Sequence, residues 1–124
     1  MSDIKILVVE DNEISMMLAH DLLKLAGYAV LKAYSAEAAI QMAQAERPNL
    51  IVMDIGLPKM DGLTATGILK ADPETAAIPI VALTAHAMPG DKERMLRAGC
   101  DFYFAKPFDV KVFLDTVAGF VGGK

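Results

Sequence analysis

The sequence predicts a doubly wound α/β domain, in which a parallel five-stranded sheet lies between two layers of helices. Five short strand-like runs alternate with five helix-like segments, and right-handed crossovers then place helices on both faces of the sheet. Three of the runs are apolar on successive residues, which is typical of strands covered on both faces. Because 124 residues is a common size for one domain, we expect a single domain over residues 1–124, with no effector domain.

The strand-like runs differ in strength. Continuous apolar runs at residues 4–9, 50–53 and 78–84 predict the first, third and fourth strands. Weaker runs at residues 29–33 and 102–105 predict edge or near-edge strands. A sheet of five strands follows from this pattern.

The first helix-like segment carries an apolar stripe at spacings of three and four: Ile14, Met17, Leu18, Leu22 and Leu25. Such a stripe is typical of an amphipathic helix. Gly27 follows the last of these residues, where a C-terminal cap is expected.

The other helices are recognised by their ends. Ser35 is a suitable N-cap for the second helix, and Pro48 follows the end of that helix. Gly99 is placed to end the fourth helix. The last three helices are predicted at residues 63–70, 91–98 and 110–120.

Composition argues against several classes of protein. Mean hydropathy is +0.37, but no apolar run approaches the ~18 residues that a membrane span needs. The start MSDIKI lacks the basic and apolar regions of a secretory signal, so we expect a cytoplasmic protein without membrane insertion. Cys100 is the lone cysteine, cannot form an internal disulfide, and is interpreted as a small buried residue. A net charge of -4 without a basic cluster disfavours a nucleic-acid partner.

The residues at the ends of the predicted strands carry the candidate chemistry. Glu10 and Asp11 follow the first strand, Asp54 follows the third, Thr84 ends the fourth, and Lys106 follows the fifth. Ligand sites of doubly wound sheets lie beyond the carboxyl ends of the strands, so these side chains are expected to converge. Crowded carboxylates either take up a proton or are neutralised by a cation, and carboxylates, a carbonyl and water suit Mg²⁺.

Four stretches of the chain resemble the signature blocks of response-regulator receiver domains, the CheY-like family. They are VVEDNE, IVMDIGLPKMDG, VALTAHAM and FYFAKPF, in the family's order and over essentially the whole chain. The stretch AAIPIVALTAHAMPGDKERMLRAGC is most similar to free-standing receivers of the DivK type. The resemblance implies a flavodoxin-like (βα)5 fold with strand order 2-1-3-4-5, the order of the family's chemotaxis member.

The resemblance also implies a reaction and a metal. Asp54 would accept a phosphoryl group from a phosphohistidine on a histidine kinase or histidine phosphotransfer protein, forming an aspartyl phosphate. Mg²⁺ would be bound by Asp11, Asp54 and the backbone carbonyl of Gly56, with Glu10 acting through a metal-bound water. Self-phosphorylation and self-dephosphorylation at Asp54 are the only catalysis that we expect.

Further roles follow from the same resemblance. Lys106 and Thr84 would contact the phosphoryl group, and Tyr103 would move with Thr84 as a switch. The bond from Lys106 to Pro107 would be a cis peptide. Gly56 and His86 occupy the two positions that tune the lifetime of the phosphoryl group. Output would be a protein contact made by the fourth helix, fifth strand and fifth helix, roughly residues 90–98 and 101–120.

Structural interpretations of the same residues stay open at this point. Glu10 and Asp11 also suit a solvated turn before a helix, and Lys106 alone resembles a surface lysine. Tyr103 also suits an amphipathic ring on an outer strand, and His86 a loop residue without a role.

Other functions also stay open. The same motifs would occur in a receiver domain excised from a hybrid histidine kinase. An aspartate-nucleophile phosphatase is less favoured, since its second acid, two residues after the nucleophile, is replaced by Gly56. A flavodoxin is disfavoured because acids follow the first strand, where a phosphate cradle needs glycine and hydroxyl residues.

Overall fold

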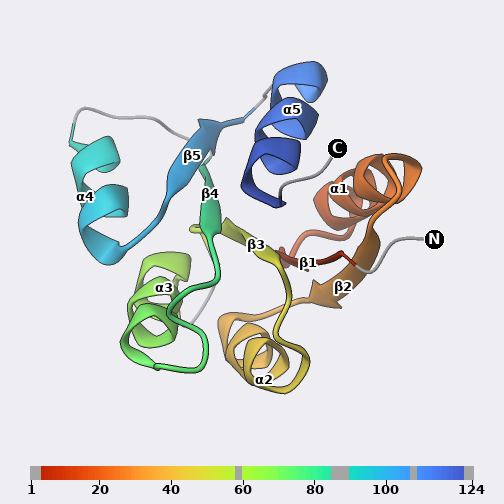
Figure 1. Cartoon of the computed structure of the whole chain (residues 1–124). Coiled ribbons are helices and arrows are strands. Elements are labelled where there is room, and N and C mark those ends of the chain that lie inside the picture. The colour runs from red at the N-terminus through yellow and green to blue at the C-terminus, as the bar shows by residue number, and fades with distance from the viewer. Residues whose placement is uncertain (1–3, 58–59, 85–89, 107–108, 122–124) are drawn as a thin grey trace.

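The computed structural model describes residues 4–57, 60–84, 90–106 and 109–121, in which strands and helices alternate (Figure 1). The strands are β1 (Lys5–Val9), β2 (Ala29–Ala33), β3 (Leu50–Asp54), β4 (Ile80–Thr84) and β5 (Phe102–Ala105). The helices are α1 (Glu13–Leu25), α2 (Ala36–Glu46), α3 (Gly62–Ala71), α4 (Asp91–Ala98) and α5 (Val110–Val121). Every element predicted from the sequence is therefore present, and the predicted limits lie close to the observed ones.

The sheet is parallel throughout and has the strand order β2-β1-β3-β4-β5. This order confirms the flavodoxin-like fold, and β2 and β5 are the edge strands, as expected. In the register of the sheet, Asp54 pairs with Leu83 and Thr84 pairs with Ala105. The residues that follow β1, β3, β4 and β5 therefore emerge at the same edge.

Alternate residues of the central strands face opposite layers of helices, because successive side chains of a strand point to opposite faces. Leu7, Ile51 and Ile80 lie in a core that α2, α3 and α4 cover. Val8 and Val52 lie in the second core, which α1 and α5 cover from the other face (Figure 1). Three central strands buried on both faces explain why their sequences are apolar without alternation.

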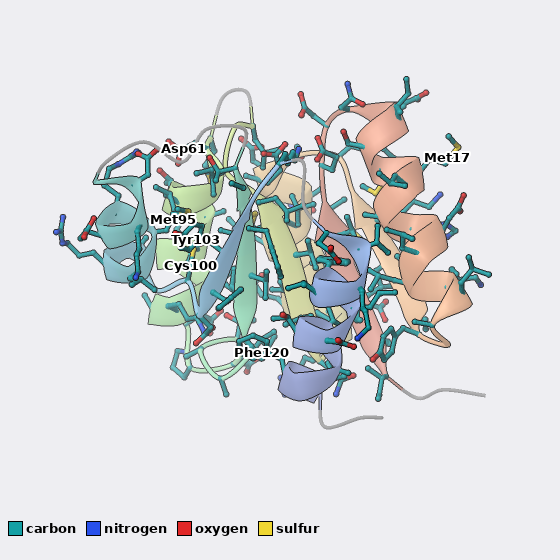
Figure 2. All side chains as sticks on the ribbon, turned by 90° about the horizontal axis from the view of Figure 1, so that it is seen from above. Met17, Asp61, Met95, Cys100, Tyr103 and Phe120 are labelled. Carbon is teal, nitrogen blue, oxygen red and sulfur yellow. The ribbon has the colours of Figure 1, made fainter. Side chains whose placement is uncertain are left out.

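The apolar stripe of α1 does not face the core, although the predicted amphipathic helix is present. Ile14 is 73% exposed and Leu25 is 86% exposed, and Met17 lies on the outer side of the helix (Figure 2). The buried side chains of α1 are Met16, Ala19 and Leu23. They also recur at spacings of three and four, so periodicity alone could not choose between the two faces.

The side chain of Lys70 joins α3 to the start of β4. Its Nζ donates to the carbonyl oxygens of Ala76 at 3.2 Å and Ile78 at 2.8 Å, and it pairs with Asp101 Oδ2 at 3.2 Å. The same Asp101 oxygen accepts a hydrogen bond from the Ile80 N–H at 2.8 Å. These contacts fix where β4 begins and where the chain enters β5.

Within the residues that the structure describes, no helix combines the length and the apolar character needed to cross a membrane.

Candidate functional site

Three carboxylates meet at the carboxyl end of the sheet. Glu10 follows β1 and Asp54 ends β3, and one carboxylate oxygen from each of Glu10, Asp11 and Asp54 lies within 4.8 Å of the others. Glu10 is only 3% exposed and Asp54 only 7% exposed, whereas Asp11 is open to solvent. The predicted convergence of the three acids is therefore present in the fold.

The turn between β1 and α1 holds Glu10 in place. The Glu10 N–H donates to the carbonyl oxygen of Ala33 at 3.0 Å, and Glu10 Oε2 accepts from the Asn12 N–H at 3.2 Å. Asn12 in turn caps α1, since its Oδ1 accepts from the Ser15 N–H at 2.9 Å. The turn does precede a helix, as the structural interpretation of Glu10 and Asp11 expected, but the cap is Asn12 and Glu10 is buried rather than solvated.

Lys106 enters the acidic cluster from the end of β5. Its Nζ lies 3.1 Å from Glu10 Oε1 and 3.8 Å from Asp54 Oδ2. Its backbone N–H donates to the carbonyl oxygen of Thr84 at 2.7 Å, which continues the pairing of β4 with β5. Lys106 is therefore not a plain surface lysine, because its ammonium group faces two buried carboxylates.

The balance of charge in the cluster raises the pKa of Glu10. Burial raises the pKa of the Glu10 carboxyl above its usual value, and the neighbouring Asp54 raises it further. The ammonium group of Lys106 acts in the opposite direction and lowers the pKa of Glu10. Lys106 thus pairs with two of the three carboxylates, so the ionised cluster carries excess negative charge.

The backbone after β3 orients the Asp54 carboxylate. Its Oδ1 accepts a hydrogen bond from the Gly56 N–H at 2.9 Å, and its Oδ2 faces Lys106. The Ile55 N–H donates to the carbonyl oxygen of Leu83 at 3.1 Å, which ties this segment to β4. One oxygen of Asp54 is therefore held by the backbone and the other lies near a cation.

The residues predicted as a switch lie on one face of the sheet. Thr84 is the last residue of β4 and is buried. In the register, Ala82 pairs with Tyr103 and Thr84 pairs with Ala105, so Thr84 and Tyr103 point to the same face. Tyr103 is half-buried beside Met95 of α4 (Figure 2). The fold allows both roles proposed for Tyr103, since it lies on the face of the sheet that α4 covers and lines a groove with Leu96 of α4.

Two predicted residues lie outside the described part of the chain. His86 was expected to influence the phosphoryl lifetime, and Pro107 to follow a cis peptide bond. Both expectations stay predictions.

The donor set of the cluster fits a divalent cation. Carboxylate oxygens are hard ligands of the kind that Mg²⁺ prefers, and the oxygens are close enough to share one ion. A cation would also offset the negative charge that Lys106 leaves uncompensated. Asp11, which is exposed, provides the side of the cluster from which an ion can enter.

A family model for the response regulator receiver domain matches residues 6–118. The chain belongs to this family. Receiver domains are signalling domains of two-component systems, and they interact with histidine kinases and with downstream targets. The predicted resemblance is therefore confirmed.

The curated relatives of this receiver domain include response regulators of the DivK type. The chain is 42% identical over 117 residues to the polar-differentiation response regulator DivK of Brucella anthropi, which covers 94% of this chain and 95% of the relative. DivK of Brucella melitensis shows the same identity and coverage.

Solved receiver structures have the same fold. The receiver domain of the sensor histidine kinase PA1611 from Pseudomonas aeruginosa, with a magnesium ion coordinated in its active-site cleft, superposes with a TM-score of 0.90. It is 34% identical, and the match covers 98% of this chain and 100% of that one. The chemotaxis protein CheY4 of Vibrio cholerae gives a TM-score of 0.89 at 26% identity, over 96% of this chain and 99% of that one.

One cavity beside the site of this receiver domain was missed by sequence reasoning. It has a volume of about 240 Å³ and touches Glu10 and Lys106, and the rest of its wall is mostly apolar: Ser15, Leu18, Ala19, Leu83 and Val110. These residues come from α1, β4 and α5, which only the fold brings together. The apolar stripe of α1, which the structure leaves exposed, was the signal in the sequence that could have found it.

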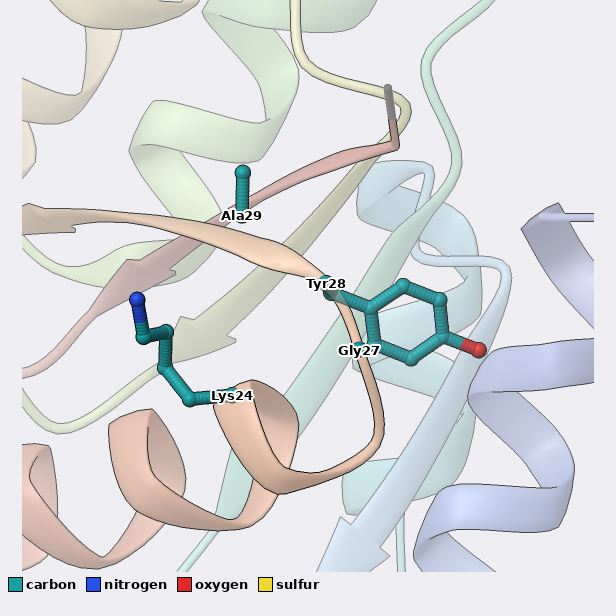
Figure 3. Close-up of a pocket in the computed structure, with 4 residues that line it drawn as sticks. All are labelled: Lys24, Gly27, Tyr28 and Ala29. Atoms are coloured by element: carbon teal, nitrogen blue, oxygen red, sulfur yellow. The ribbon is translucent and has the colours of Figure 1, made fainter. Parts of the chain in front are cut away.

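A second hollow lies at the opposite end of the sheet from the acidic cluster. It has a volume of about 270 Å³ and is lined by Lys24, Gly27, Tyr28 and Ala29. Figure 3 shows the side chains of Lys24 and Tyr28 pointing in different directions. Because its polar groups do not converge, this hollow does not resemble a ligand site.

Proposed function

We propose that this receiver domain accepts a phosphoryl group on Asp54 from a phosphohistidine of a histidine kinase or histidine phosphotransfer protein. An oxygen of Asp54 attacks phosphorus while the bond from phosphorus to the histidine nitrogen breaks, and the freed electron pair stays on that nitrogen. The observation that carries the proposal is the position of Asp54, a nearly buried carboxylate with one oxygen facing Lys106 and with two further acids beside it.

Mg²⁺ is the metal that the proposal requires. Asp11, Asp54 and the backbone carbonyl of Gly56 would hold it, and Glu10 would act through a bound water. Mg²⁺ supplies positive charge that offsets the carboxylates and the phosphoryl oxygens. Support comes from the cluster of carboxylate oxygens within 4.8 Å, and from the magnesium ion in the related receiver domain of PA1611.

Apart from the nucleophile Asp54, the residues of the site would stabilise charge rather than react. The transferred phosphoryl group spreads negative charge over its oxygens, so positioned donors lower the barrier. Lys106 already lies within 3.8 Å of Asp54 Oδ2, and the Thr84 hydroxyl lies at the end of the adjacent strand. Both are placed to bind phosphoryl oxygens after transfer.

We infer that the phosphohistidine donor approaches along α1. The cavity of about 240 Å³ borders Glu10 and Lys106 and has apolar walls from α1 and α5. Next to it, Met17 is 57% exposed and Leu18 is 54% exposed, so an apolar surface continues along the helix. An apolar helix face of a donor protein fits this surface, because burying it removes exposed apolar area from water.

The proposed output face is formed by α4, β5 and α5. A groove of about 420 Å³ runs along β5 beside α4, and its wall includes Tyr103 together with Leu96 and Phe102, which are 47% and 41% exposed. The cations of this face alternate with acids: Lys92, Arg94 and Arg97 with Asp91, Glu93, Asp101 and Asp109. An apolar groove with mixed charge suits a protein partner and not nucleic acid.

The domain is proposed to act without a fused output domain. Its identity of 42% to DivK over 95% of that protein favours a stand-alone regulator. A receiver domain from a hybrid histidine kinase is the alternative, since the PA1611 receiver domain is 34% identical. The proposed chemistry at Asp54 is the same in both cases.

The deciding experiment is incubation with acetyl phosphate and Mg²⁺ followed by intact-mass measurement. The wild type should gain one phosphoryl mass, and Asp54→Asn should gain none. Asp61→Asn is the matched control, because Asp61 lies on the same loop but only caps α3 through Thr64. Labelling of Asp54→Asn at the wild-type rate would exclude Asp54 as the acceptor.

A further inference from the structure

Gly62 lies where no side chain fits. It is the first residue of α3 and is buried against the end of β3. A Cβ atom added to Gly62 would lie 2.5 Å from the backbone oxygen of Asp54, 2.7 Å from the Cα of Ile55 and 3.0 Å from the Cγ of Met53. Real Cβ atoms essentially never approach a neighbour closer than 3.0 Å, so the two backbone contacts exclude even alanine without movement.

The need for glycine here is a matter of space and not of backbone conformation. Among the described residues, the glycines with positive φ are Gly27, Gly90 and Gly99. Gly62 has a backbone that any residue can adopt, since it begins a regular helix. The absence of a side chain at Gly62 therefore lets α3 lie close to the backbone of Asp54 and Ile55, at the proposed phosphorylation site.

Two hydrogen bonds of Gly62 also hold the start of α3 in place. The Gly62 N–H donates to the carbonyl oxygen of Ile55 at 3.3 Å, directly after Asp54. The carbonyl oxygen of Gly62 accepts from the buried Thr66 hydroxyl at 2.8 Å. A rigid helix is thus tied to the backbone that carries the candidate nucleophile.

We propose that Gly62 is a positioning residue for phosphoryl transfer, acting through the backbone of Asp54 and Ile55. Residues 54–56 provide the attacking carboxylate, the N–H that holds its Oδ1, and the carbonyl assigned to the metal. Any side chain at position 62 displaces this segment from α3. This inference rests on the function proposed for Asp54.

Gly62→Ala and Gly67→Ala form a matched pair on one helix, because a Cβ on Gly67 meets nothing within 4 Å. Alanine favours a helix over glycine, so Gly67→Ala should raise the Tm and keep wild-type phosphorylation. Gly62→Ala should lower the Tm, and its labelling rate at saturating Mg²⁺ should fall about tenfold or more, because small misplacements of reacting groups are costly. The Kd for Mg²⁺ should rise several-fold.

A third variant separates positioning from simple loss of stability. Val117→Ala opens space in the core on the other face of the sheet, where Val117 is fully buried. At a temperature where all variants are folded, Val117→Ala should keep the wild-type rate and Mg²⁺ affinity, although its Tm is lower. If Gly62→Ala also keeps both, the positioning role is wrong. If the wild type itself is not labelled, the proposed function fails instead, and the Mg²⁺ titration still tests Gly62.

A measurement on the wild type covers the case in which Gly62→Ala does not fold. Amide hydrogen exchange and chemical shifts are recorded with and without beryllofluoride and Mg²⁺. The Gly62 amide should be protected and should shift when the phosphoryl mimic binds. Exchange at the rate of a free loop, with no shift, would overturn the proposal.

Discussion

Lys106 is nearer to Glu10 than to Asp54, at 3.1 Å compared with 3.8 Å. The unphosphorylated domain therefore uses its lysine chiefly to compensate a buried glutamate. A phosphoryl group on Asp54 would compete for the same ammonium. Contact between the lysine and the phosphoryl group would then weaken an existing ion pair, so the lysine proposed to bind the phosphoryl group already has a partner before transfer.

Removing this lysine should therefore affect stability as well as signalling. Lys106→Ala leaves the buried Glu10 carboxylate without its cation, so the free energy of unfolding in the absence of metal should fall by about 1–3 kcal/mol. Glu10→Gln should recover part of this loss in the double variant, because it removes the unpaired charge. Urea unfolding of the wild type, the two single variants and the double variant measures the coupling energy between Lys106 and Glu10. Strictly additive losses would contradict the ion pair.

The switch residues should separate reaction from response. Thr84→Ala and Tyr103→Ala remove neither the proposed nucleophile nor a metal ligand, so both should still gain a phosphoryl group on Asp54. Binding of a downstream target should no longer respond to phosphorylation. Mass measurement gives the first result and titration with the target gives the second. If Thr84→Ala blocked labelling, its role would be chemical.

The burial of Cys100 can be tested by the pH dependence of its thiol. Burial raises the pKa of the Cys100 thiol above its usual value of 9.0, and the hydroxyl of Thr66 only partly opposes this. The folded pKa is the higher one, so the thiol contributes stability that is complete below pH 9.0 and is lost as pH rises through the folded pKa. We expect slow alkylation of the native thiol at pH 8 and a loss of stability above pH 9.0 that is smaller in Cys100→Ala. Rapid alkylation of the folded wild type would contradict this.

Some residues of the candidate site could be predicted from the sequence, and others could not. Glu10, Asp54 and Lys106 were found because each lies at the carboxyl end of a strand, and parallel strands end at one edge of the sheet. Gly62 was not found, since its role depends on the distance between two backbone segments. No periodic pattern records such a distance.

Among the elements, α1 shows where periodicity is ambiguous. The helix has two apolar faces with similar spacing. The face with Met16, Ala19 and Leu23 lies against the core, while side chains such as Met17 remain exposed. The existence of the helix follows from its sequence, but its rotation depends on how the layers pack.

The two faces of α1 should respond differently to substitution. Met17→Gln changes an exposed side chain, so the free energy of unfolding should change by no more than about 0.5 kcal/mol. Leu23→Ala removes a fully buried side chain and should cost about 2–5 kcal/mol. Met17→Gln should nevertheless slow transfer from a phosphorylated donor protein and leave labelling by acetyl phosphate unchanged. Equal effects on both donors would exclude docking along α1.

The output face gives a prediction for α4 and β5 together. Hydrogen exchange is compared with and without beryllofluoride, and then with a target domain added. We expect the mimic to change protection around Asp54, and the change to extend to Tyr103 and α4, because Tyr103 packs against the core to which Met95 of α4 belongs. Changes confined to the loops around Asp54 would exclude this face as the output.

At the scale of the whole molecule, the alternation of elements was enough to predict two helix layers on a parallel sheet. The order of the strands could not be predicted in this way, because several orders satisfy the same alternation of strands and helices. The order β2-β1-β3-β4-β5 came from family resemblance, and the structure confirms it. Local patterns of apolar residues specify the layers, whereas the order of the strands in the sheet depends on contacts between residues far apart in the chain.

The place of β1 in the centre of the sheet has a consequence for synthesis on the ribosome. β1 is made first, yet its partner β3 ends at Asp54, and Lys106 follows the last strand of all. Pairings between such distant segments form slowly, because loop closure precedes any gain from contact. While β5 and Lys106 are still in the ribosome, the nascent chain already contains Glu10 and Asp54 but lacks the lysine that pairs with them. The proposed acceptor site is therefore complete only once nearly the whole chain has folded, so an immature molecule should not draw phosphoryl groups from a kinase.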